Sequence, residues 1–195
     1  MDTTEVLGLE LRQFQGRGLR TMVPLVVGQT EEAVQRRNPT SRSVRNWDED
    51  SFFAELGTRA SEAELQAARG VVNWMKEKAD HIEFGKGQKD GSIGGRFTRP
   101  DGPSFTPILL YTYGRVEFQF QWMKEIPYFD TMDHRRDLMH RLNGISGISI
   151  GEASLDKRPA TPLTSITSEA SQQMLVSILN WAVDAYKSSP IVRRA

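Results

Sequence analysis

Apolar residues at every second position mark the start of the chain as extended. Leu7, Leu9 and Leu11 share one face of a predicted strand, and the apolar run 22–27 follows turn residues 15–18. Pro24 indicates an edge position or a strand start in that second run. Because two strands alone are marginal in water, we expect this ribbon to pack on the main domain, a second copy or a partner. Residues 30–44 then predict a short helix followed by a linker.

Helical spacing replaces this alternation after residue 46. Asp48 or Asn46 is placed to cap a helix that reaches Leu56, and Gly57 ends it. Ser61 and Glu64 have the spacing of a capping box. The helix behind that box is amphipathic, with apolar residues at helical spacing at Leu65, Ala68, Val72, Met75 and Ala79.

The centre of the chain returns to a strand pattern. Four strands are predicted, over residues 82–84, 92–99, 106–113 and 115–123. The last has the clearest alternation, because Val116, Phe118, Phe120 and Trp122 fall on one face and Arg115, Glu117, Gln119 and Gln121 on the other.

Two further helices are predicted after the strands. Asp130 or Thr131 caps the first, which stops at Gly144, and Ser168 caps the second. Between them we expect one short strand, 148–150, and a proline-rich loop. This order predicts an α+β fold: an antiparallel meander of about four strands with helices packed on one face, plus the N-terminal β-ribbon. The expected divisions are a ribbon and basic linker (1–45), a main domain (46–189) and a tail (190–195).

Composition narrows the function classes. The chain has no cysteine, which excludes disulfides, thiol catalysis and cysteine-ligated metals within it. No apolar run approaches the roughly 18 residues needed to span a bilayer, and the polar start lacks the pattern of a signal peptide. We therefore expect a cytoplasmic protein without membrane contact.

The charge is balanced overall but unevenly distributed. The chain has 25 basic and 25 acidic residues, which argues against indiscriminate binding of nucleic acid. Residues 12–45, however, contain seven arginines and only two acids, a net charge of +5. This basic patch could hold a phosphate backbone or simply solubilise a linker. Its candidate contact residues are Arg12, Arg17, Arg20, Arg36 and Arg37.

A glycine-rich segment, residues 85–92, is a candidate anion site. Its glycines could expose backbone N–H groups, and Lys86, Lys89 and Ser92 add polar groups. It matches neither the P-loop nor the dinucleotide-binding pattern, and a strand rather than a helix is predicted after it. A tightly turned hairpin is the simpler interpretation, and a phosphate or nucleic-acid contact is the alternative.

The polar face of the fourth predicted strand is a second candidate surface. Arg115, Gln119 and Gln121 have side chains suited to base edges and phosphates, although a merely solvated sheet face is the commoner case.

Signals for catalysis are weak. His134 and His140 are six residues apart, so they would not share a helix face, and His81 stands alone. We expect no metal and no cofactor. An enzyme using Lys86, Asp90, Ser92 and Glu117 around the glycine-rich turn is a lesser alternative.

The large aromatic residues lie at element starts or on apolar faces, so we assign them to the core. They are Trp47, Phe52, Phe53, Trp74, Trp122 and Trp181.

Three segments resemble a C-terminal module of uncharacterised bacterial proteins: 47–53, 83–92 and 113–122. In those proteins the module follows a predicted nuclease-like domain of the restriction-endonuclease fold. The similarity spans roughly residues 46–187, and the ribbon over 9–28 resembles the last strands of the nuclease-like domain.

The chain departs from such a nuclease in its acidic residues. The resemblance would imply an Asp/Glu-x-Lys motif to hold Mg²⁺, but no acid here is followed two residues later by lysine. Glu10-Leu11-Arg12 and Asp133-His134-Arg135 have arginine instead. The sequence thus leans away from an enzyme. It favours a non-catalytic accessory module that contacts DNA, RNA or a protein partner, with self-association through the ribbon as an alternative.

Overall fold

The computed structural model describes residues 8–16, 19–27, 45–100 and 102–190, with side chains from residue 45 onward. The chain divides into two compact units, residues 1–43 and 44–195. In the first unit, β1 (Gly8–Gly16) and β2 (Leu19–Val27) form an antiparallel ribbon in which Leu11 pairs with Pro24. The predicted ribbon is confirmed. The predicted short helix within 30–44 lies outside the described residues.

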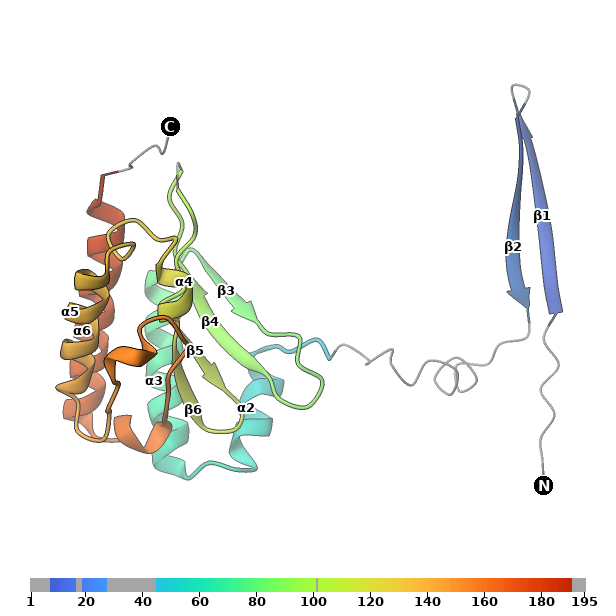
Figure 1. Cartoon of the computed structure of the whole chain (residues 1–195). Helices are drawn as coiled ribbons and strands as arrows, with labels where there is room; N and C mark the ends of the chain where they lie inside the picture. The colour runs from blue at the N-terminus through green and yellow to red at the C-terminus, as the bar shows by residue number, and fades with distance from the viewer. Residues whose placement is uncertain (1–7, 17–18, 28–44, 101, 191–195) are drawn as a thin grey trace. The chain divides into compact units, whose positions relative to one another are not determined.

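The second unit is an α+β domain with a five-stranded antiparallel sheet in the order β3-β4-β5-β6-β7 (Figure 1). Its strands are β3 (His81–Phe84), β4 (Ser92–Arg96), β5 (Ile108–Tyr111), β6 (Arg115–Phe118) and β7 (Ala160–Pro162). The predicted α+β class is therefore confirmed, with one strand more than expected.

The main helices begin where the sequence places their caps. Asp48 caps α2 (Glu49–Gly57) and Ser61 caps α3 (Glu62–Lys78), each through a capping box. Thr131 caps α5 (Met132–Asn143), and Ser168 caps α6 (Glu169–Ser188). In each case a side-chain oxygen accepts a backbone N–H that the helix leaves without a partner.

One face of the sheet packs on these helices. Ile93, Phe97, Leu110, Val116 and Phe118 are buried. α3 packs against β3, β4 and α6, and α5 packs against α6 (Figure 1). Gly95 allows the close approach of α3, since a Cβ there would lie 3.0 Å from that of Ala79 and 3.2 Å from that of Met75.

The opposite face, which we call the open face, carries the alternate side chains of the same strands. These side chains are half-exposed or exposed: Glu83, Ser92, Arg96, Leu109, Tyr111, Arg115 and Glu117.

The predicted fourth strand is too long. β6 ends at Phe118, and the chain turns into the single-turn helix α4 (Phe120–Met123). Gln121 donates its backbone N–H to the Lys157 carbonyl oxygen at 2.8 Å, outside any strand ladder. Phe120 and Met123 are both buried because three-residue spacing also places side chains on one helix face. Alternation over so short a segment did not distinguish the two structures.

The segment between α5 and α6 also differs from the prediction. Residues 148–150 form no strand, although Ile148 and Ile150 are buried. The predicted proline-rich loop instead contains a 3₁₀ turn, η1 (Glu152–Ser154), and β7, which pairs with β6 through Val116 and Thr161. A second 3₁₀ turn, η2 (Leu163–Ile166), leads toward α6.

Candidate functional site

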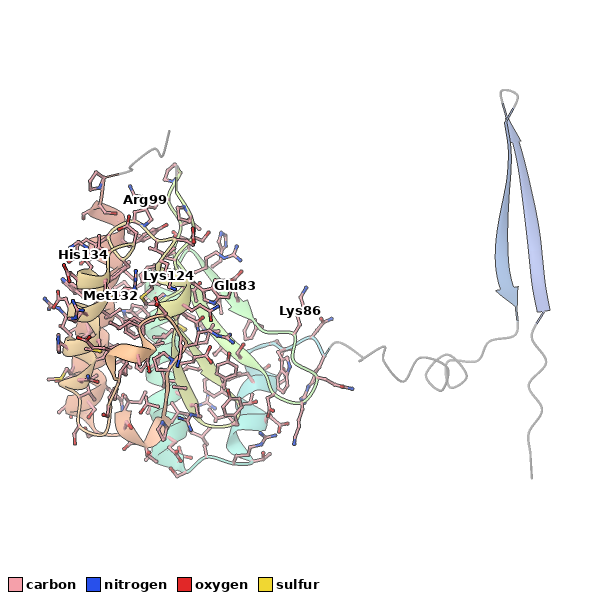
Figure 2. The ribbon with its side chains drawn as sticks, viewed as in Figure 1. Glu83, Lys86, Arg99, Lys124, Met132 and His134 are labelled. Carbon is pink, nitrogen blue, oxygen red and sulfur yellow. The ribbon has the colours of Figure 1, made fainter. Side chains whose placement is uncertain are left out.

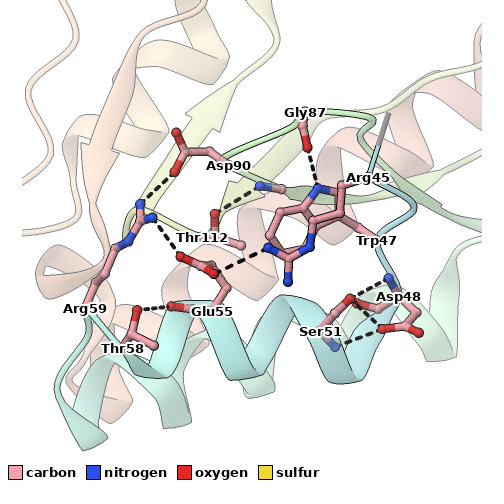
Figure 3. A network of polar contacts seen from close by, with 11 residues as sticks. Arg45, Trp47, Asp48, Ser51, Glu55, Thr58, Arg59, Gly87, Asp90 and Thr112 are labelled. Atoms are coloured by element: carbon pink, nitrogen blue, oxygen red, sulfur yellow. Dashed lines mark hydrogen bonds and ion pairs between the residues drawn. The ribbon is translucent and has the colours of Figure 1, made fainter. Parts of the chain in front are cut away.

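The glycine-rich turn between β3 and β4 is packed against Trp47 (Figure 3). The Trp47 indole N–H donates to the Gly87 carbonyl oxygen at 2.6 Å. A Cβ added at Gly91 would lie only 2.5 Å from the Trp47 ring, and one at Gly87 would lie 2.0 Å from the Asp90 carbonyl oxygen. These glycines therefore allow the turn to close on itself and on a buried ring, which explains them without a ligand.

Polar contacts hold the same turn to α2. Arg59, just after α2, donates to Asp90 at 2.6 Å and to Glu55 at 2.7 Å, and Arg45 lies 3.5 Å from Glu55 (Figure 3). The hydrogen bond to Asp90 is the main cause of a raised pKa of the Arg59 guanidinium. Asp90 is thus engaged in a structural contact.

The predicted lysines of this turn are exposed. Lys86 and Lys89 are both solvent-exposed, and Figure 2 shows Lys86 projecting outward from the turn. No ion pair involves either ammonium group within the part of the chain that the structure describes. Ser92 is half-buried at the start of β4 and would contact any Cβ added at Gly85. The turn thus presents two exposed positive charges on a fixed backbone.

Glu117, on β6, is an acid of the open face that has several partners. The Tyr111 hydroxyl donates to Glu117 Oε1 at 3.1 Å, and Gln119 Nε2 donates to the same oxygen at 2.8 Å. The Arg158 guanidinium lies 3.7 Å away. Burial raises the pKa of Tyr111 to about 12, and the Glu117 carboxylate adds to that shift. The negative charge of Glu117 is therefore compensated by hydrogen bonds and a cation of the protein itself.

Two of the polar side chains predicted on the exposed face of the fourth strand, 115–123, do not lie there. Gln119 is only 4% exposed, so its amide serves the fold rather than a free surface. Gln121 is exposed but lies on α4. Arg115 is exposed on β6, as expected, and donates to the Ala160 carbonyl oxygen at 2.5 Å.

Two aromatic side chains near the open face are exposed. Tyr113 is 41% exposed at the β5–β6 turn and stacks on Tyr111, with ring centroids 4.9 Å apart. Trp122 is 56% exposed on α4. The assignment of Trp122 to the core is therefore wrong, because the residue lies in a helical turn instead of on the buried face of a strand.

A pocket of about 430 Å³ lies between Trp122 and the strands β3 and β4 of the open face. Glu83 and Arg96 form an ion pair on one wall, while Gln119 and Trp122 contribute from the segment that follows β6. The rest of the lining is formed by Ser104, Phe105, Thr106, Met123 and Ile126. We call this cavity the Trp122 pocket.

A glycine shapes the sheet beside this pocket. Gly94 pairs with Glu83, and a Cβ at Gly94 would lie 2.4 Å from the Leu109 Cδ2 atom and 3.2 Å from the Thr106 Cγ2 atom. The absence of a side chain at Gly94 lets Leu109 and Thr106 close over β4. The side chains of Glu83, on β3, and Arg96, on β4, are each 41% exposed.

Reasoning from the sequence missed Glu83, Arg96, Tyr113 and Trp122 as site residues. The signal that could have found the ion pair is the short hairpin, which brings residues 83 and 96 to one face of neighbouring strands. No local signal marks Trp122, since its exposure depends on where β6 ends.

The alternative catalytic set is divided among different contacts. Asp90 pairs with Arg59, whereas Glu117 accepts hydrogen bonds from Tyr111 and Gln119. In the predicted basic patch, Arg12 lies on β1 and Arg20 on β2, while Arg17, Arg36 and Arg37 lie outside the described residues.

Among the described residues, no group of three histidine or acidic side chains is arranged to hold a metal ion. None of the helices in that same part of the chain combines the length and apolar character needed to cross a membrane. Comparisons of the chain with family models, curated proteins and solved structures find no match.

Proposed function

We propose that this protein is a non-catalytic module that binds single-stranded nucleic acid across the open face of its sheet. The observation that carries the proposal is the exposure of Trp122 and Tyr113 around an antiparallel sheet face whose reverse side packs on helices. Exposed aromatic rings on such a surface are the arrangement on which unpaired bases stack.

Exposed aromatic rings distinguish this face from an ordinary solvated sheet. Large aromatic side chains are normally buried, so the exposure of Tyr113 near the open face and of Trp122 beside the pocket is informative. Every base has a flat π-face, and each base stacked on an aromatic side chain contributes about 1–3 kcal/mol with little sequence preference. Tyr113 and Trp122 lie toward opposite ends of β6, which provides two stacking positions along one strand path.

The charges around this face suit a phosphate backbone. The acids Glu83, Asp90 and Glu117 each have a cationic neighbour. Lys86 and Lys89 have no carboxylate partner within the described part of the chain, so their charge is available. Separately from the open face, the sequence of segment 12–45 carries a net charge of +5. Positive charge of this kind attracts nucleic acid regardless of sequence.

Binding of a fluorescent oligothymidylate, followed by anisotropy at two salt concentrations, tests the proposal. We expect saturable binding that weakens steeply with salt, because phosphate contacts release counterions. A duplex of the same length should compete poorly, since its stacked bases cannot reach Trp122 or Tyr113. No binding at low salt, or stronger binding to the duplex, contradicts the proposal.

A second candidate function is association through the β1–β2 ribbon. In the described residues, each nine-residue strand has the other as its ladder partner, which leaves one edge of each strand open. Open edges can accept another strand, either from a second copy or from a different protein. Light scattering of the full chain and of residues 44–195 tests this function. An oligomer that becomes a monomer on truncation supports it, and equal association states contradict it.

A further inference from the structure

The Trp122 pocket has the chemistry to recognise one particular base. We infer that it binds a single unstacked guanine, whose ring stacks on Trp122 and whose polar edge meets Glu83 and Arg96. This inference rests on the proposed binding of single-stranded nucleic acid and adds the base that the surface selects.

The size and lining of the pocket suit one base. A volume of about 430 Å³ lies in the range of roughly 300–1,000 Å³ that is usual for small-molecule sites. Phe105, Met123 and Ile126 line the pocket but are at most 4% exposed, so Trp122, which is more than half exposed, supplies most of its accessible apolar surface. A flat aromatic ligand can therefore stack on Trp122 while one edge remains free to form hydrogen bonds.

One wall of the pocket carries a hydrogen-bond acceptor, Glu83, beside a hydrogen-bond donor, Arg96. Glu83 Oε1 is paired with Arg96 Nη2, so the two side chains hold each other in place. In the described part of the chain, Arg96 is the partner that the structure gives Glu83. A carboxylate has about four acceptor positions, and a guanidinium has five N–H donors. Both groups thus retain hydrogen-bonding capacity toward a ligand.

Guanine complements this pair better than the other bases. Its N1–H and N2–H donors point the same way and can meet both carboxylate oxygens of Glu83. Its O6 and N7 acceptors suit the arginine fork of Arg96, which is the commonest specific contact to guanine in DNA complexes. Adenine and cytosine offer one amino group beside an acceptor on that edge. Thymine flanks its single N–H with two carbonyl oxygens, which would face the carboxylate.

The fold supports this arrangement from beneath. Gly94, which pairs with Glu83, has no side chain, and Thr106 and Leu109 fill the space that one would occupy. Gln119, on the other side of the pocket, is fixed by its hydrogen bond to Glu117. The base edge would therefore meet Glu83 and Arg96 on a preformed surface.

The test compares oligothymidylates that carry one central guanine, adenine, cytosine or hypoxanthine, with an all-thymine strand as reference. We expect the guanine strand to bind about tenfold tighter than the adenine strand. Hypoxanthine should fall between them, because it retains N1–H but lacks the N2 amino group. This comparison uses the unmodified protein, so it does not depend on the folding of a variant.

Glu83→Gln sharpens the assignment, with Glu125→Gln as the matched control. Both acids are on the surface, but Glu125 does not line the pocket. Glu83→Gln should reduce the preference for guanine to less than about threefold, whereas Glu125→Gln should leave it intact. A preference that survives Glu83→Gln overturns the role of Glu83.

The outcomes separate this inference from the proposed function. Equal binding of all five strands overturns the guanine pocket while leaving single-strand binding in place. Failure of every strand to bind at low salt overturns the proposed function itself. Tighter binding of the adenine strand overturns the assignment of the edge contacts.

Discussion

The glycine-rich turn and the Trp122 pocket both combine glycine, charged residues and a tryptophan. They differ in whether the tryptophan ring is accessible to a ligand. At the turn, Trp47 is 6% exposed, its N–H is bonded to Gly87 and its ring lies against Gly91. At the pocket, Trp122 is 56% exposed beside a cavity. At the turn, the glycines and Trp47 pack together and complete the fold. At the pocket, the Trp122 ring stays accessible to a ligand.

A motif rich in glycine and charge is therefore not by itself a site. The turn has the glycines and lysines of a candidate anion site, yet the backbone groups of Gly87 and Gly91 bond to Trp47 and Thr112. The pocket has no comparable sequence motif. Substitutions should therefore separate stability from binding in the two regions.

The largest effect is expected from Trp47→Ala. Removing a buried ring leaves a cavity under Gly91 and an unpaired Gly87 carbonyl, so the free energy of unfolding should fall by about 3–5 kcal/mol. Urea denaturation measures it. Lys86→Ala on the same turn is the control and should change stability by less than about 0.5 kcal/mol. Equal effects of the two substitutions would show that the turn is not held by Trp47.

Trp122→Ala should weaken binding and leave stability almost unchanged. More than half of this residue is already in water, so the free energy of unfolding should change by less than about 1 kcal/mol. Oligonucleotide binding should weaken by about 1–3 kcal/mol, because the variant lacks one stacking position. Met174→Ala removes an exposed apolar side chain from α6 and serves as the control for anisotropy. If both variants bind as tightly as the unmodified protein, Trp122 has no part in the site.

The lysines test whether the turn contributes charge rather than a pocket. Replacing both Lys86 and Lys89 by alanine should reduce the slope of log affinity against log salt by roughly 0.7 for each phosphate that the variant no longer neutralises. Binding should weaken similarly for all base sequences. Lys78→Ala, at the end of α3, is the control. A slope that does not change places the phosphate path elsewhere on the surface.

The smallest effect concerns Tyr111, whose hydroxyl donates to Glu117 on the open face. Because the folded-state pKa of Tyr111 is raised to about 12 from 10.0, its contribution to stability is fully present below pH 10 and is lost as the pH rises toward 12. Ultraviolet titration should show a late tyrosinate step that disappears in Tyr111→Phe. If that step occurs near pH 10 instead, the Tyr111 hydroxyl is neither buried nor bonded to Glu117 as the structure describes.

Local signals in the sequence predicted much of the fold. Asp48, Ser61, Thr131 and Ser168 cap helices at the places their residue types indicate, and the ribbon and the first strands of the sheet were also found. These features depend on hydrogen bonds within one turn or on alternation over a few residues. That information is contained in a short stretch of chain.

The candidate site was predicted only in part. Lys86, Lys89 and Arg115 are exposed as expected, but Gln119 is buried and the ion pair of Glu83 with Arg96 was not foreseen. The polar appearance of a residue does not reveal whether a distant neighbour will bond to it. For Gln119 that neighbourhood includes Glu117, itself held by Tyr111 from the adjacent strand.

Residue order alone was enough for the class of fold, the starts of the helices and the two faces of the sheet, because period and caps act over a few residues. The end of β6 at Phe118, its pairing with β7 and the burial of Trp47 but not of Trp122 became visible only in the folded chain. These outcomes depend on partners such as Pro159 and Lys157, whose backbone carbonyls accept hydrogen bonds from residues 118 and 121, far away in the chain.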